Sequence, residues 1–231
     1  MNPPKIDVII PVLNEEDSIG KVIMDIPDIV QDIIVCNNGS DDNTAEVALS
    51  KGAIVVNQPI KGYGIACLKG MEYIANKSKD KQPDIVVFLD GDYSDYPEEL
   101  LKVIAPILED DMDVVIGSRA IGERESGSMM PQQVFGNWLA TTLIRLFYKY
   151  KFTDLGPFRA IKYDKLLELN MIDENFGWTV ELQVKAAKKK MKCTEVAVNY
   201  RNRIGESKVT GTIKGSVMAG YKILWTIFKY L

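Results

Sequence analysis

The sequence predicts an α/β fold built on a doubly wound, mostly parallel sheet, and three observations lead to this prediction. Apolar runs of strand length alternate with helix-length segments. Residues 85–89 are all apolar, as expected for a strand that is covered by helices on both faces. This run leads directly into Asp90-Gly91-Asp92, which places two carboxylates at the carboxyl edge of the sheet. In open α/β sheets, ligands bind at that edge.

The expected strands and helices follow one another along a single domain. Strands are expected at residues 6–12, 33–38, 53–56, 85–89 and 113–119. Shorter helices are expected to end near residues 26, 51, 76 and 108, and two longer helices to cover residues 131–150 and 212–231.

The composition is that of an ordinary globular protein and excludes several classes of active site. Of the 231 residues, 46% are apolar and 26% are charged. The chain contains no histidine, which excludes Ser-His-Asp and Cys-His catalysis and histidine-ligated metals. Its cysteines, Cys36, Cys67 and Cys193, form no C-x-x-C motif, so neither a zinc site nor a disulfide framework is indicated. With no signal peptide visible, we expect a cytoplasmic protein that can associate peripherally with the cytoplasmic face of a membrane.

Charge is divided unevenly along the chain. Residues 1–140 contain 11 basic and 24 acidic residues, whereas residues 141–231 contain 17 basic and 8 acidic residues. The overall net charge of −4 hides this asymmetry. A basic carboxyl-terminal part favours an anionic partner, either phosphate groups or an anionic membrane surface. We expect no nucleic-acid partner.

Polar and acidic residues follow the first, second and fourth expected strands. No G-x-G-x-x-G follows the first strand and no P-loop sequence occurs, so standard dinucleotide binding and P-loop chemistry are not indicated. Each polar cluster alone could be a helix cap or a turn, and Asp41 illustrates this alternative. Three clusters at one sheet edge favour a binding site instead; they consist of Asn14 and Glu15, of Asn37, Asn38 and Asp41, and of Asp90 and Asp92.

Asp90 and Asp92 are the candidate metal ligands. Two carboxylates this close repel each other unless a cation lies beside them. Mg²⁺ or Mn²⁺, bound by one or two carboxylates together with substrate phosphates, is the cation that this chemistry favours. The alternative is an acidic turn that only caps the helix expected to begin near Pro97.

Five segments carry a resemblance to a known family. They are, in chain order, residues 9–16, 37–44, 61–64, 90–92 and 117–119. In this order they resemble the motifs of the family 2 glycosyltransferases, and most closely those of the dolichyl- or polyprenyl-phosphate hexosyltransferase branch. The resemblance covers about residues 5–210. It implies a GT-A fold in which residues 1–125 bind a nucleotide-diphosphate sugar and residues 126–231 bind the acceptor.

The resemblance also implies roles for individual residues. Asp92 would hold the metal on the diphosphate, and Asp90 would contact the metal or the ribose. Residues of the first two motifs would line the base and the ribose, namely Pro11, Glu15 and Asn38. The remaining residues of the implied donor site are Asn14, Asp41, Lys61 and Gly62.

Two positions depart from the family pattern. Asn37-Asn38 replaces the paired aspartates that usually occur there, and an amide oxygen accepts the imino proton of uracil or guanine more weakly than a carboxylate does. Ser94 replaces a glutamine that often serves as a further metal ligand. Asp95 either takes over that role or caps the following helix.

The carboxyl-terminal part supplies the candidate phosphate and acceptor residues. Glu181 and Asp154 are the candidate bases, although Glu181 also suits a helix start as an acid that the helix dipole favours. A solvated basic loop is the alternative to a phosphate clamp at residues 200–208. The cations that we expect to grip phosphates are Arg201, Arg203 and Lys208, with Arg119 in support.

Two helices in this part are dense in aromatic and aliphatic residues. The helix at 131–150 is apolar over more than half its circumference, so we expect it to be core, with lipid contact as the alternative. The last helix carries an apolar stripe with Lys222 and Lys229 on the opposite side. Its lysines argue against a transmembrane span. Trp225 and the lysines suit an interfacial helix, and packing on the sheet or on a second subunit of a homo-oligomer is the alternative.

Together these features predict a metal-dependent, inverting glycosyltransferase. It would transfer a hexose from a UDP- or GDP-sugar to a polyprenyl or dolichyl phosphate at a membrane surface. Such a phosphate is already ionised near neutral pH, so no base is needed. A soluble or saccharide hydroxyl acceptor would need Glu181 or Asp154 as the base. A sugar nucleotidyltransferase and a non-catalytic module that binds nucleotide sugars are the remaining alternatives.

Overall fold

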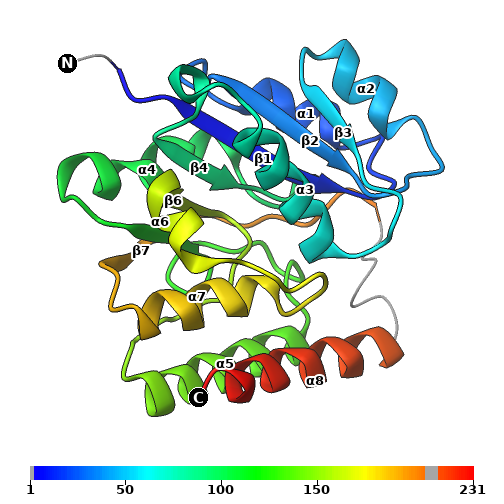
Figure 1. Ribbon diagram of the computed structural model, residues 1–231. Helices are drawn as coiled ribbons and strands as arrows, with labels where there is room; N and C mark the ends of the chain where they lie inside the picture. The colour runs from blue at the N-terminus through cyan, green and yellow to red at the C-terminus, as the bar shows by residue number, and fades with distance from the viewer. Residues whose placement is uncertain (1–2, 206–212) are drawn as a thin grey trace.

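The computed structural model describes residues 3–205 and 213–231, and a seven-stranded sheet forms the centre of this part of the chain (Figure 1). Its strands are β1 (Ile6–Val12), β2 (Asp32–Asn37), β3 (Ile54–Asn57), β4 (Ile85–Phe88), β5 (Val114–Ser118), β6 (Arg159–Lys162) and β7 (Cys193–Ala197). The strand order is β3-β2-β1-β4-β6-β5-β7. Every neighbouring pair is parallel except the two pairs that involve β6. The predicted doubly wound, mostly parallel α/β fold is therefore confirmed.

Helices cover both faces of the sheet. They are α1 (Ile19–Asp25), α2 (Thr44–Ser50), α3 (Tyr63–Ala75), α4 (Leu100–Glu109), α5 (Pro131–Tyr148), α6 (Tyr163–Leu169), α7 (Trp178–Lys188) and α8 (Ile213–Lys229), with 3₁₀ helices at Lys79–Lys81 and Pro97–Glu99. One face carries α1, α2 and α4, and the other carries α3, α6 and α7. The helices α5 and α8 contact each other and α7, and they lie side by side at the bottom of Figure 1.

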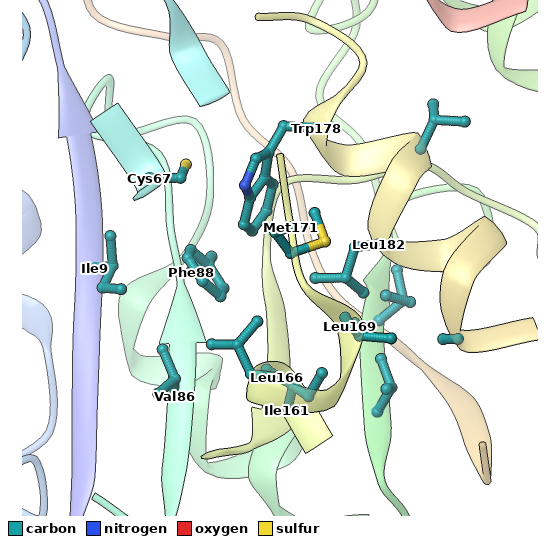
Figure 2. Close-up of a cluster of buried hydrophobic side chains, with 14 of the residues drawn as sticks. Ile9, Cys67, Val86, Phe88, Ile161, Leu166, Leu169, Met171, Trp178 and Leu182 are labelled. Carbon is teal, nitrogen blue, oxygen red and sulfur yellow. The ribbon is translucent and has the colours of Figure 1, made fainter. Parts of the chain in front are cut away.

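The sheet residues alternate between two cores, one on each face. Ile9, Val86 and Phe88 belong to the core on the side of α3 and α7, which Figure 2 shows. In this core the ring centroid of Phe88 lies 4.5 Å from that of Trp178, the first residue of α7. Successive strand residues point to opposite faces, so a run that is apolar at every position needs helices on both faces. Burying each such side chain stabilises the fold by about 1.5–3 kcal/mol.

Three elements, β6, β7 and α6, have no counterpart among the expected elements. They are short, with 4, 5 and 7 residues, and their compositions are mixed. The direction of β6 follows from the path of the chain. The strand β5 ends at the carboxyl edge of the sheet, and the chain stays at this edge through α5. The chain therefore enters β6 from the same edge, so that β6 runs antiparallel to β4 and β5.

The outer sides of α5 and α8 expose many large apolar residues. The expectation that α5 is mostly core is wrong, because α5 buries only a narrow face of Ala140, Thr141 and Ile144. On α8, Thr226 and Ile227 are buried, whereas most of the expected apolar stripe faces outward. Within the described residues, no helix is both long and apolar enough to cross a membrane. We call the exposed residues the α5–α8 surface: Phe135, Trp138, Leu146, Phe147, Val217, Met218, Tyr221, Trp225, Phe228 and Leu231.

The chain changes direction across the sheet between β1 and β4. It runs from β1 outward through β2 to β3, and then returns to the other side of β1 as β4. At such a switch point the adjoining loops diverge and leave a crevice at the carboxyl ends of the strands. The polar clusters that follow β1, β2 and β4 therefore meet at this crevice.

Candidate active site

A cavity of about 540 Å³ opens at the carboxyl ends of β1 and β4, and we call it the donor cavity. Loops of the first half form one wall, and α5, α8 and the segment before α7 form the other. The predicted site residues that line it are Pro11, Glu15, Asn38, Lys61, Gly62, Asp90, Asp92, Arg119 and Arg203. The predicted residues that do not line it are Asn14, Asp41, Asp154, Glu181 and Arg201. Lys208 lies outside the described residues.

Local contacts fix the position of Asp92. The side chain is 4% exposed, and its Oδ1 accepts hydrogen bonds from the Ser94 backbone N–H (2.9 Å) and hydroxyl (2.5 Å). We call residues 90–95 the acidic turn. Gly91 allows this turn to approach β1, because a Cβ there would lie 2.5 Å from Cγ1 of Val12. Ser94 therefore orients Asp92 through a tight turn of the backbone.

Asp90 is held by Tyr63, the first residue of α3. Its Oδ1 accepts a hydrogen bond from the Tyr63 hydroxyl (3.2 Å). Burial, followed by the negative charge of Asp92, raises the pKa of Asp90 to about 6. Asp92 forms an ion pair with Arg203, with 2.9 Å between Oδ2 and Nη1. One cation therefore faces two carboxylates, and a second cation would relieve the remaining repulsion.

These carboxylates fit a divalent metal ion that the donor helps to bind. Among the described residues, no group of three His, Cys, Asp or Glu side chains could enclose a metal by itself. Mg²⁺ and Mn²⁺ commonly use one or two carboxylates and take their other ligands from phosphate oxygens and water. Asp90 and Asp92 could hold such an ion at the cavity wall, with the diphosphate completing its ligands.

Backbone hydrogen bonds place the segment after β7 beside the acidic turn. Arg201 N–H donates to the Ser94 carbonyl and Ile204 N–H donates to the Asp92 carbonyl, at 2.9 Å each. The side chain of Arg203, between them, reaches Asp92 and lines the donor cavity. Arg203 is thus available to a phosphate in the cavity.

Arg201 turns away from the donor cavity. Its guanidinium lies over the rings of Tyr93 and Tyr96, 3.4 and 4.2 Å from their centroids. It also donates to the carbonyls of Tyr93 (2.7 Å) and Asp95 (3.1 Å). The side chain therefore holds the acidic turn in shape, and this geometry does not favour the predicted contact with phosphate.

Arg203→Ala and Arg201→Ala are expected to have different effects although the two residues lie in one loop. Arg203→Ala should lower kcat/KM by a factor that corresponds to roughly 1.5–3 kcal/mol of charge-assisted hydrogen bonding, with little change in Tm. Arg201→Ala should lower Tm, because two aromatic rings lose their cation. Steady-state kinetics and thermal unfolding of both variants check this. Equal losses of kcat/KM with unchanged Tm would contradict the assignment.

Arg119 and Asp154 form a buried bidentate ion pair. Arg119 Nε and Nη2 donate to Asp154 Oδ2 and Oδ1, and the Arg119 backbone N–H also donates to Oδ2, all at 2.8 Å. Burial raises the pKa of Asp154, but Arg119 outweighs burial and holds the pKa below its ordinary value. Asp154 therefore positions Arg119 at the cavity wall. The geometry does not favour Asp154 as a base, because a proton would have to displace these bonds.

Glu181 is fully buried in the first turn of α7, away from the donor cavity. Its carboxylate accepts hydrogen bonds from the N–H groups of Ile172 (3.1 Å) and Asp173 (2.8 Å) and from the Tyr230 hydroxyl (2.6 Å). Lys185 Nζ lies 2.7 Å from its Oε1. Burial raises the pKa of Glu181, but these partners outweigh burial and lower it below its ordinary value. Glu181 therefore ties α7 to the end of the chain, and this position does not favour a role as base.

Asn38 shapes the loop that carries Lys61 and Gly62. Its amide nitrogen donates to the carbonyls of Gln58 (3.1 Å) and Ile60 (2.7 Å), and its Oδ1 accepts from the Gly62 N–H (2.7 Å). An aspartate could not make the first two bonds, because a carboxylate has no N–H to donate. This loop therefore gives a physical reason for an asparagine at a position where an aspartate is usual.

Gly64 lets the same loop approach the segment before α7. A Cβ on Gly64 would overlap the carbonyl oxygen of Asp173. Ile65 N–H donates to the Glu174 carbonyl (2.9 Å) next to this contact. On its other side, Asp173 forms an ion pair with Lys222 of α8 (2.9 Å). The loop at 61–64 therefore packs against the segment before α7, and this segment in turn contacts α8.

Asn14 and Asp41 join the loop after β1 to the loop after β2. Asn14 has a φ of 54°, which asparagine tolerates better than most residues. Its Oδ1 accepts from the Asp41 N–H (2.8 Å), and its own N–H donates to Ser40 Oγ (3.0 Å). Glu15 follows and lines the cavity, and its Oε2 accepts from Ser18 Oγ (3.0 Å). These contacts fix the entrance to the donor cavity.

Comparisons with known proteins identify the family. A model described as glycosyl transferase family 2 matches residues 7–168. The chain belongs to this family. It is 33% identical over 216 residues to an uncharacterised glycosyltransferase of Mycobacterium tuberculosis, which covers 93% of this chain and 94% of that protein. A dolichyl-phosphate hexose transferase of Haloferax volcanii is 32% identical over 206 residues, or 87% of this chain and 85% of that protein. The predicted family and its likeness to the polyprenyl-phosphate branch are confirmed.

A solved structure supports the GT-A fold of this family 2 glycosyltransferase. Glucosyl-3-phosphoglycerate synthase from Mycobacterium tuberculosis, in complex with Mn²⁺, UDP and phosphoglyceric acid, is similar with a TM-score of 0.74. The similarity covers 98% of this chain and 78% of that chain at 21% identity. At this identity the likeness shows the fold alone. The family match makes this chain a glycosyltransferase and sets aside the nucleotidyltransferase alternative.

Several residues of the glycosyltransferase cavity were not singled out from the sequence. Tyr63 contacts Asp90 and lines the cavity. Because Tyr63 lies inside the motif at 61–64, its position in that motif could have identified it as a site residue. Tyr200 lines the cavity, and its ring centroid lies 4.9 Å from the Arg119 guanidinium. Residues of the segment before α7, by contrast, carry no motif; they are Asn175 and Phe176.

The position of Asp95 favours neither a metal ligand nor a cap of the following helix. The residue is 1% exposed, does not line the donor cavity and makes no side-chain cap of the following helix. Neither of its carboxyl oxygens has a hydrogen-bond partner in the part of the chain that the structure describes. Burial, followed by the charge of Asp90, raises the pKa of Asp95 well above its ordinary value. Asp95 is therefore a buried acid whose surroundings disfavour its charged form.

Proposed function

We propose that this family 2 glycosyltransferase transfers a hexose from a UDP- or GDP-sugar to a polyprenyl phosphate at a membrane surface. One observation carries the proposal: the donor cavity joins the acidic turn to the two helices of the α5–α8 surface. Asp92 and Arg203 line the cavity on one side, and Gly136 of α5 and Ile223 of α8 line it on the other. An acceptor held in lipid against the outer sides of these helices could therefore reach the donor.

In the proposed reaction, an oxygen of the acceptor phosphate attacks the anomeric carbon of the sugar. The bond from that carbon to the diphosphate breaks, the configuration inverts and the nucleoside diphosphate leaves. A divalent cation held by Asp90 and Asp92 would neutralise the charge that grows on the leaving diphosphate. Arg203 and Arg119 line the same cavity and offer further positive charge to the phosphates.

The positions of the acids support a phosphate acceptor over a hydroxyl acceptor. A hydroxyl needs a base within hydrogen-bond reach, whereas a phosphate monoester with a second pKa of about 6 is already ionised near neutral pH. Asp154 and Glu181 both lie outside the donor cavity and are engaged in ion pairs. The relatives include both chemistries, since one is named for dolichyl phosphate and another binds phosphoglyceric acid.

Peripheral binding to a membrane is supported by the α5–α8 surface and by the basic composition of the carboxyl-terminal part of the chain. Phe135, Trp138, Tyr221 and Trp225 are each more than half exposed, although large aromatic residues usually bury most of their surface. The part of the chain from residue 141 onward is basic. Each Lys or Arg near an anionic bilayer contributes about 1 kcal/mol to binding.

Co-sedimentation and transfer assays with vesicles test the proposal. We expect the protein to sediment with anionic vesicles, less so at high salt, and to transfer sugar to polyprenyl phosphate in them. Leu146→Ala, which removes an exposed residue of α5, should weaken sedimentation. Leu49→Ala is the matched control, because Leu49 is similarly exposed (58% against 66%) but lies on α2. Absence of sedimentation, with transfer only to water-soluble saccharides, would overturn the proposal.

A further inference from the structure

A second cavity, of about 370 Å³, lies next to the donor cavity, and we call it the basic hollow. Its walls are the loop after β5, α5 and residues 151–154. The two cavities share Met129 and Asn137. Asn137 is fixed between them, because its Nδ2 donates to the Thr153 carbonyl (2.9 Å) and its Oδ1 accepts from the Leu155 N–H (2.8 Å). The basic hollow therefore adjoins the donor cavity, and Asn137 is part of the boundary between them.

Three cations from three segments line the basic hollow. They are Arg124 of the loop after β5, Arg145 of α5 and Lys151. None of them forms an ion pair with a residue that the structure describes. Asp154 also lines the hollow, but its charge is already neutralised by Arg119. The basic hollow therefore has an excess of positive charge in its walls, and an anion bound there would be attracted to these cations.

The remaining wall of the basic hollow is partly apolar. Val134 and Trp138 of α5 and Phe152 contribute to it. A phosphate ester matches this combination, because its phosphate can meet the cations while its organic part meets the apolar side chains. The combination of cationic and apolar side chains in the walls therefore fits an organic phosphate.

We propose that the basic hollow binds a phosphate group of the acceptor. This inference rests on the proposed function, in which the donor diphosphate is bound near Asp92 and Arg203. Those residues line the donor cavity and not the basic hollow, so the hollow is left for a second molecule that carries phosphate. Either a polyprenyl chain or a soluble compound could carry this phosphate ester, and the experiment distinguishes the two.

Binding of inorganic phosphate to the full chain, with Mn²⁺ and nucleoside diphosphate already bound, tests the hollow without any transfer reaction. Calorimetry should show saturable phosphate binding. The double variant Arg145→Gln/Lys151→Gln, which we call the hollow variant, should have an affinity for phosphate that is lower by roughly tenfold for each cation removed. The matched control is Lys21→Gln with Lys51→Gln, which removes two exposed lysines from α1 and from the end of α2. Equal phosphate binding by the wild type and the hollow variant would overturn the inference. A parallel loss of nucleotide affinity in the hollow variant would also overturn it.

Transfer kinetics with two acceptors identify the source of the phosphate. The hollow variant should lose at least tenfold in kcat/KM for whichever acceptor is used, a short polyprenyl phosphate or a water-soluble sugar phosphate, with the KM for the donor unchanged. A loss confined to the polyprenyl phosphate supports both the inference and the proposed function. A loss confined to the soluble phosphate supports the basic hollow and overturns the lipid acceptor. Unchanged kcat/KM for both acceptors would overturn the inference.

Discussion

Asp92→Asn is expected to abolish sugar transfer and metal-dependent donor binding while leaving the fold intact. The substitution keeps an oxygen that can accept the hydrogen bonds from Ser94 but removes the negative charge that faces Arg203. A neutral amide binds Mg²⁺ or Mn²⁺ far more weakly than a carboxylate. Because charge stabilisation of the leaving group is lost, kcat should fall by at least roughly 10²–10³-fold. A transfer assay and calorimetric titration of the donor, with and without Mn²⁺, measure both effects.

Asp95→Asn provides a matched control on the same acidic turn. Asp95 lies three residues further on, but it is buried and lies outside the donor cavity. Removing its ionisable group should therefore leave the metal dependence of donor binding unchanged. Near-normal transfer by Asp92→Asn, or an equal loss in both variants, would remove Asp92 from the metal site.

The strands that could be predicted from sequence are those whose apolar pattern is broken at one position at most. Every residue of β1 is buried, including its one charged residue, Asp7, whose carboxylate meets Lys77 (2.5 Å), and β4 is apolar throughout. By contrast, β6 begins with Arg159, a fully buried guanidinium. That cation donates to backbone carbonyls, including those of Leu155 (3.0 Å) and Thr179 (2.9 Å). The Thr179 carbonyl comes from the start of another element, α7, so the pattern of residues in β6 gives no sign of a buried strand.

The candidate site was predicted well where a short motif forms it and poorly where charges depend on distant partners. The turn at 90–92 and the loop at 61–64 both line the donor cavity, as expected from local sequence. Arg201 and Arg203 are two residues apart, and yet one stacks on tyrosines while the other faces Asp92. Sequence records only that both are cations. Their partners come from a turn more than 100 residues away, which no local pattern reveals.

The helix α5 shows a different limit of sequence reasoning. Its composition predicts burial on most sides, but apolar content gives no information about which neighbours are available to cover it. In the structure α8 and α7 cover only the face with Ala140 and Ile144. Trp138 and Leu146 are left exposed. An apolar helix that is only partly covered is typical of a protein with a further partner or a lipid surface to bind.

Glu181→Gln is expected to lower the free energy of unfolding by roughly 3–5 kcal/mol, with a much smaller effect on kcat once the protein is folded. The carboxylate is fully buried and neutralises Lys185, so removing its charge leaves a cation of α7 without its partner. Glu181 now accepts hydrogen bonds from the Asp173 N–H and the Tyr230 hydroxyl. The amide NH₂ of a glutamine would face one of these donors and could not accept its hydrogen bond. Tyr230→Phe is the milder comparison, because it removes one hydrogen bond to a charged group, worth roughly 1.5–3 kcal/mol.

The pH dependence of unfolding separates this anchoring role of Glu181 from a role as base. Because the pKa of Glu181 is lowered in the folded protein from an ordinary value of 4.5, its contribution to stability is fully present above pH 4.5 and is lost as the pH falls through the lowered value. Urea unfolding should therefore show a large gap between the wild type and Glu181→Gln at pH 7, and the gap should narrow below pH 4.5. If Glu181 were the base, the opposite result is expected. The Glu181→Gln variant would then be as stable as the wild type, its kcat would be greatly reduced, and one limb of the pH–rate profile would disappear.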